Sequence, residues 1–130
     1  MNSSIQDLLT RFDHFNDSVL RSFSFTYSRT GLNNASVWIY AQDWTFGEQD
    51  VWSMVKFTMD EVSEASFCET HRHCLPSISF GIHVCKFGKD VAIEFGGLFS
   101  ESIESIDDIR KSAAYVICRD ISFEIEENIQ

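Results

Sequence analysis

Residues 19–28, with the sequence VLRSFSFTYS, alternate large apolar side chains with small polar ones, and this stretch decides the fold class. Phe23, Phe25 and Tyr27 stand at every second position, with serine or threonine between them. A period of two is that of a β-strand, whose successive side chains point to opposite faces of a sheet. The stretch therefore predicts a half-buried strand whose aromatic side chains point inward.

The chain on both sides of this stretch continues in the same way. Turn-forming residues at 30–34 separate it from an apolar run that begins at Val37, which predicts a β-hairpin. Further strands are expected at 51–59 and 91–95, and residues 61–67 should continue or re-enter the sheet. We expect one strand over 78–85 and a last long strand over 114–125, bent near Arg119 and Asp120.

Two segments have a helical period instead. An apolar stripe at i, i+3, i+4 and i+7 predicts an N-terminal helix and consists of Ile5, Leu8, Leu9 and Phe12. Isoleucines at three-residue spacing from position 103 predict a short late helix. No linker or repeat divides the chain, so we expect a single domain over residues 1–130. The predicted class is α+β, mainly β: an antiparallel sheet or sandwich with an N-terminal helix and one short late helix.

The strand phases also predict which large side chains form the core. Six of them should be buried together, namely Phe23, Phe25, Trp38, Phe57, Phe80 and Ile93. Trp52 is expected in the core as well, whereas Trp44, which lies near a turn beside Asp43, is expected to be exposed.

Charge and composition restrict the classes of partner. The chain has 20 acidic and 10 basic residues and a formal net charge of −10, which repels the phosphates of nucleic acids. No apolar stretch is long enough to span a membrane, and the N-terminus lacks the pattern of a signal peptide. We therefore expect a cytoplasmic protein with no nucleic-acid or membrane partner, and its four cysteines should be free thiols.

The search for catalytic motifs predicts a protein that is not an enzyme, because no phosphate-binding loop, zinc-protease motif or nucleophile elbow is present. One dense group of potential metal ligands comprises Cys68, His71, His73 and Cys74. Cysteine and histidine are zinc ligands, so a small zinc-binding protein is the alternative function. The spacing fits no standard zinc finger, and a polar loop with buried thiols at its ends explains the same residues.

The leading hypothesis is a non-catalytic protein-binding module. Between Asp43 and Glu69, seven acidic residues stand against Lys56 alone, and residues 94–108 contain five acidic residues and no basic one. Such a charge distribution favours a basic protein partner, although it would also keep a Phe-rich domain soluble. The predicted partner-binding residues combine carboxylates with an exposed aromatic ring: Asp43, Trp44, Glu48 and Asp50.

Residues 15–25, FNDSVLRSFSF, resemble the opening of small bacterial β-rich families, some uncharacterised and some described as toxin immunity proteins. Residues 55–62 and 91–97 look like the second and penultimate sheet segments of those families. The resemblance implies a compact sheet-based fold, no known cofactor, and an immunity-type role in which the protein blocks a basic toxin. Asn16 stands where these families have histidine, so no role of that histidine can be carried over.

Overall fold

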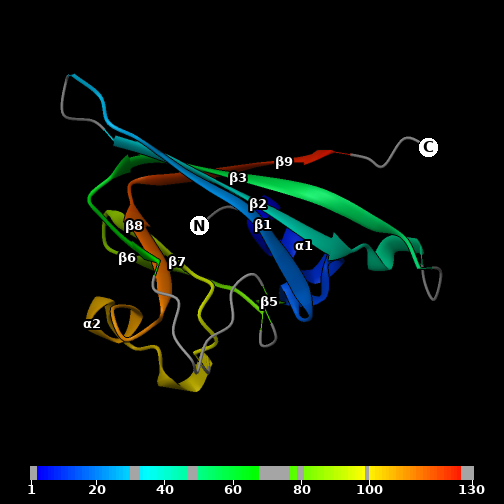
Figure 1. Cartoon of the computed structure of the whole chain (residues 1–130). Coiled ribbons are helices and arrows are strands. Elements are labelled where there is room, and N and C mark those ends of the chain that lie inside the picture. Colours follow the sequence, from blue (N-terminus) through cyan, green and yellow to red (C-terminus); the bar gives the residue numbers. More distant parts are fainter. Residues whose placement is uncertain are drawn as a thin grey trace.

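Two antiparallel β-sheets and an N-terminal helix form the fold (Figure 1). The computed structural model describes residues 3–29, 33–46, 50–67, 77–78, 81–98 and 100–126. The larger sheet crosses the top of Figure 1, with the smaller sheet below its left half and α1 below its right half. This arrangement confirms the predicted α+β, mainly β class.

The larger sheet has the strand order β5-β1-β2-β3-β9. Its strands are β1 (Ser18–Thr26), β2 (Asn33–Gln42), β3 (Trp52–Val62), β5 (Ser77–Ile78) and β9 (Asp120–Glu126). β1 pairs with β2 in antiparallel orientation, which confirms the predicted hairpin, and its register shifts between Leu20 and Ser22. β3 lies between β2 and β9, so β9 forms one edge of this sheet.

The smaller sheet has the strand order β4-β8-β7-β6. Its strands are β4 (Glu64–Phe67), β6 (His83–Phe87), β7 (Asp90–Glu94) and β8 (Ala114–Cys118). At Ser63 and at Arg119 a single residue separates a strand of one sheet from a strand of the other. The chain therefore bends near Arg119, as predicted. The single long strand predicted over 114–125 was wrong, because β8 and β9 belong to different sheets.

Five helical segments are described, and only the first is longer than four residues. They are α1 (Ser3–Arg11), η1 (Asp13–Phe15), η2 (Trp44–Phe46), η3 (Ser100–Ser102) and α2 (Ile106–Ile109). The predicted apolar stripe of the first helix is confirmed, because all four of its side chains are buried. The late helix is confirmed as α2, whose Ile109 packs against Ile117 and Tyr115 on the outer side of the smaller sheet.

The main core lies between the larger sheet on one side and the smaller sheet and α1 on the other. Alternate residues of β2 and β3 point into it, including Val37, Ile39 and Phe57, which are all 0% exposed. From the smaller sheet, Ile93 and Val116 join the same cluster. A sheet that buries one face in this way has inward and outward side chains in alternation along each strand. Residues 35–42 of β2 and 52–60 of β3 follow this alternation.

The predicted core set is confirmed in part. Phe57 and Ile93 are buried, and Phe23 and Phe25 are half-buried against the same cluster. The burial of Trp38 was predicted wrongly, because Val37 and Ile39 occupy the inner side of β2 and place Trp38 on the outer side. Trp52 is likewise half-buried on the outer side of β3.

Two further corrections concern the first predicted strand and the strand predicted over 78–85. Tyr27 follows the end of β1 and is 81% exposed, so its inward orientation was predicted wrongly. Residues 78–85 do not form one strand, since β5 and β6 belong to different sheets. Gly81 has a φ of +79°, and a Cβ there would lie 2.5 Å from the His14 carbonyl oxygen. Phe80, the remaining member of the predicted core, lies outside the described residues.

Candidate functional site: the open face of the larger sheet

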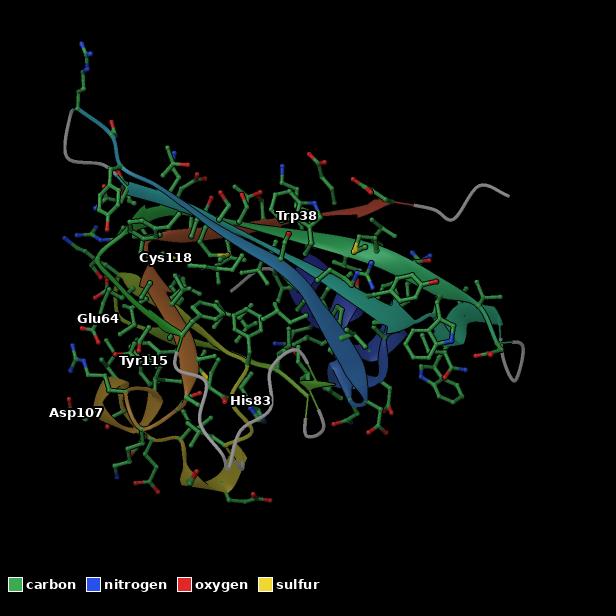
Figure 2. All side chains as sticks on the ribbon, in the orientation of Figure 1. Trp38, Glu64, His83, Asp107, Tyr115 and Cys118 are labelled. Carbon is green, nitrogen blue, oxygen red and sulfur yellow. The ribbon has the colours of Figure 1, made fainter. Side chains whose placement is uncertain are left out.

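The outer side of the larger sheet is the candidate site. No described helix or strand lies over this side (Figure 1). We call it the open face, and define it by the outward side chains of β2, β3 and β9: Ser36, Trp38, Tyr40, Trp52, Met54, Lys56, Thr58, Ser122, Glu124 and Glu126. Figure 2 shows Trp38 on this side, with Cys118 between the two sheets.

Three aromatic rings and one lysine ammonium make two contacts on the open face. The rings of Tyr40 and Trp52 stack with centroids 5.4 Å apart and planes 28° apart. The Lys56 ammonium lies 5.1 Å from the centroid of the Trp38 ring, within the range of a cation–π interaction. Aromatic side chains that are held in this way lose little conformational entropy when a partner binds over them.

The strand register sorts these side chains into an aromatic part and an acidic part. Trp38 lies opposite Lys56, and Lys56 lies opposite Glu124 on β9. In the next row, Met54 lies between Tyr40 and Glu126. Because Lys56 is the only basic residue on β2, β3 and β9, the acidic β9 flanks an aromatic surface that carries a single positive charge.

The described members of the predicted partner-binding set lie at the end of the sheet where β2 leads to β3. Trp44 is 46% exposed, as predicted. Asp50 is exposed and accepts a hydrogen bond of 2.6 Å from the indole Nε1 of Trp52, which ties it to the open face. Glu48 lies outside the described residues. Partner binding by these residues stays a prediction.

The placement of Asp43 at the surface was wrong. Its side chain is 0% exposed, and the Arg11 guanidinium of α1 donates to both of its carboxylate oxygens at 2.7–3.1 Å. The Thr45 backbone N–H donates to Oδ1 at 3.0 Å. Burial pushes the pKa of Asp43 upward, but the hydrogen bonds from Arg11 and Thr45 outweigh it, so that this pKa lies below its ordinary value. Asp43 therefore anchors α1 to the end of β2.

The outer side of the smaller sheet is covered, in contrast to the open face. α2 lies against it, and Tyr115 and Ile117 of β8 are buried there with Ile109. At one margin, the Tyr115 hydroxyl donates to Glu64 at 2.5 Å, and Arg110 bonds both Glu64 and Asp107. Glu64, Asp107 and Tyr115 lie together beside α2 in Figure 2. The hydrogen bonds from Tyr115 and Arg110 lower the pKa of Glu64.

A fully buried carboxylate, Glu94, lies on the same covered side. His83 Nδ1 lies 2.8 Å from Oε2, while the Ser112 hydroxyl at 2.9 Å and the Leu98 backbone N–H at 3.1 Å donate to Oε1. A histidine oriented by a carboxylate is also an arrangement used in acid–base catalysis. Here both oxygens of the carboxylate are engaged, and they join β6 and β7 to the segment before β8. We therefore interpret this group as structural.

The four predicted zinc ligands, Cys68, His71, His73 and Cys74, lie outside the described residues. Within the described ranges, no group of three or more histidine, cysteine or acidic side chains could hold a metal ion.

The two described cysteines bear on the predicted free thiols. Cys85 and Cys118 are free thiols, as expected. Burial raises the pKa of the Cys118 thiol to about 12. Burial, together with the Glu94 carboxylate, also raises the pKa of the Cys85 thiol. Both side chains are therefore poor nucleophiles, since the thiolate is the reactive form.

Comparison with known proteins adds no relative to this description. The sequence matches no protein-family model, and neither a curated protein nor a solved structure is similar enough to count as a match. Among the described helices, none is long and apolar enough to cross a membrane. Function is therefore inferred from the geometry of the chain itself, in which the open face is an aromatic surface that no described helix or strand covers.

Proposed function

We propose that this chain is a non-catalytic protein-binding module that docks a partner on the open face. The observation that carries the proposal is an uncovered sheet face with three half-buried aromatic rings, of which Tyr40 and Trp52 stack on each other and Trp38 contacts the Lys56 ammonium. Tryptophan, tyrosine and methionine are enriched at the centres of protein interfaces, and polar side chains are typical of the rim. The aromatic centre and the flanking hydroxyl and carboxylate groups of the open face match that composition.

The charge of the chain supports a basic partner. Glu124 and Glu126 are exposed beside the aromatic rings, and Asp50 is exposed at the end of the face where β2 leads to β3. An acidic surface speeds the encounter with a cationic protein and disfavours nucleic acids. The specific version of the proposal is an immunity-type inhibitor in the cytoplasm that blocks a basic toxin, such as a nuclease that must itself bind phosphates.

Affinity capture tests the proposal. Full-length protein is immobilised at low salt, and each captured protein is identified, purified and titrated back by calorimetry. We expect a basic protein whose affinity falls at least tenfold in Trp38→Ser/Tyr40→Ser, because truncation of aromatic anchors costs about 2 kcal/mol or more at an interface.

The control variant changes two exposed residues on the covered side. In Glu101→Lys/Glu104→Lys, the first residue lies in η3 and the second between η3 and α2, away from the larger sheet, and the variant should leave the affinity within about twofold at moderate salt. Equal affinity of the wild type and the Trp38→Ser/Tyr40→Ser variant, with both proteins folded, would exclude the open face as the docking surface.

A further inference from the structure

We infer that the partner adds an extended strand to the free edge of β9, with basic side chains on the open face and apolar side chains under the sheet. This inference rests on the proposed function and specifies how the partner binds. β9 is hydrogen-bonded to β3 on one side only, so alternate N–H and C=O groups of its seven residues point away from the sheet. An extended segment can complete such an edge through main-chain hydrogen bonds.

β9 is the sheet edge best suited to strand addition. The opposite edge is occupied at Ser18 and Val19 by β5, and a register shift follows directly at Leu20 to Ser22. Irregular edges of this kind protect a sheet from further pairing. In the smaller sheet, the edge strands β4 and β6 have four and five residues. β9 has seven residues and a register with β3 that runs without a shift from Asp120 to Glu126.

The side chains of β9 specify the sequence pattern of the added strand. Glu124 and Glu126 are exposed on the open face, Asp120 is exposed at the start of the strand, and Phe123 and Ile125 lie on the inner side. Cross-strand neighbours of opposite charge stabilise a sheet, and like charges placed opposite each other destabilise it. The fitting occupant therefore alternates lysine or arginine with apolar residues.

The same rule disfavours a second copy of this chain as the occupant. Two β9 strands paired edge to edge would bring the carboxylates of Glu124 and Glu126 near those of the other copy, without a cation on either strand.

A cavity under the β9 edge provides room for the apolar side chains. Phe123 and Ile125 line it together with Asp7, Leu8 and Arg11 of α1, and its volume is about 260 Å³. Phe123 and Ile125 are only half-buried, although their counterparts on β3 are fully buried. An added strand would place its inward side chains beside them and remove their remaining apolar surface from water. Edge, charge and cavity thus favour the same occupant.

The test uses a synthetic peptide that alternates lysine with valine over the length of β9, titrated into the full-length ¹⁵N-labelled protein. The backbone amides of β9 should shift, and those that point away from β3 should exchange with solvent at least about tenfold more slowly. The control is the same peptide with N-methyl groups along one edge, which keeps the charge and removes the main-chain hydrogen bonds. Equal binding of the two peptides would show that charge attraction alone is at work and would overturn the inference.

A charge reversal adds a reciprocal test. Glu124→Lys/Glu126→Lys should lose about tenfold or more in affinity for the lysine peptide and gain affinity for a peptide that alternates glutamate with valine. Glu101→Lys/Glu104→Lys makes the same change in net charge elsewhere and should leave the lysine peptide bound through β9.

The same spectra separate this inference from the proposed function. The indole N–H signals of Trp38 and Trp52 report on the open face, and the β9 amides report on the edge. A peptide that shifts the indole signals alone would overturn strand addition and leave docking on the open face standing. The absence of any response in β9 at saturating peptide would also overturn it, while the proposed function would still depend on the capture experiment.

Discussion

The outer sides of the two sheets differ, although both belong to antiparallel sheets over one core. β8 of the smaller sheet is buried on both faces, and α2 covers Tyr115 and Ile117 on its outer side. Between Ala35 and Gln42 of β2 and between Trp52 and Asp60 of β3, in the larger sheet, buried and half-buried residues alternate. Packing on the outer side of the smaller sheet therefore stabilises the fold, whereas the outer side of the larger sheet stays accessible to a partner. The difference shows that a large apolar side chain on an outer sheet face packs in a core only where another element covers that face.

The largest effect that this comparison predicts is on stability. Ile117→Ala removes a side chain that is 2% exposed, and we expect a loss of about 3 kcal/mol in the free energy of unfolding, because a cavity remains. Met54→Ala, on the open face of a central strand, should cost about 1 kcal/mol or less. Urea unfolding of both variants measures the difference. Equal losses would mean that the open face is packed as tightly as the covered one.

Two carboxylates at one end of the larger sheet also differ in burial: Asp43 is buried and Asp50 is exposed. Asp43→Ala removes a buried partner of Arg11 and of the Thr45 N–H and should cost about 2 kcal/mol. Asp50→Ala, at an exposed position, should change the free energy of unfolding by no more than about 0.5 kcal/mol. Thermal unfolding at neutral pH compares the two variants, and a larger loss for Asp50→Ala would contradict the assignment of Asp43 as the anchor.

The pH dependence of stability should report the same anchor. Because the pKa of folded Asp43 lies below its ordinary value of 3.8, its contribution is complete above that value and is lost as the pH falls through the folded pKa. The gap in stability between the wild type and Asp43→Asn should therefore narrow as the pH is lowered below about 4. Urea unfolding at a series of pH values measures the gap, and a gap that stays constant down to acid unfolding would show that the carboxylate charge plays no part.

The smallest effect is expected at the margin of the covered side. Tyr115→Phe removes the hydrogen bond to Glu64 and leaves the ion pair between Glu64 and Arg110 in place. We expect a loss of about 1 kcal/mol or less, since a single partly exposed hydrogen bond contributes little net stability. The variant should also raise the pKa of Glu64, because that hydrogen bond favours the charged carboxylate. NMR titration of the Glu64 side chain measures this change.

Alternation along the strands was sufficient to predict the class of fold from the sequence. The β1–β2 hairpin, the α1 stripe and the bend at Arg119 were all predicted from residue spacing, because local backbone periods determine which side chains share a face. The side of β2 and β3 that faces the core could also have been assigned from the sequence. Trp38 shares its side of β2 with Ser36 and Gln42, and Trp52 shares its side of β3 with Lys56 and Thr58. The polarity of these neighbours indicates the outer side, and it is a better guide here than the size of the tryptophans.

Spacing along the sequence could not predict which strand joins which sheet or what covers a face. Residues 78–85 alternate like one strand, yet the φ of +79° at Gly81 and its close approach to His14 separate β5 from β6. Asp43 resembles any acidic turn residue until α1 brings Arg11 to it from 32 positions earlier. The sequence by itself thus determined the strands, the first helix and the net charge, which depend on local periods and composition. The tertiary structure alone decided which carboxylates are buried and which face is open, because contacts between distant segments set both.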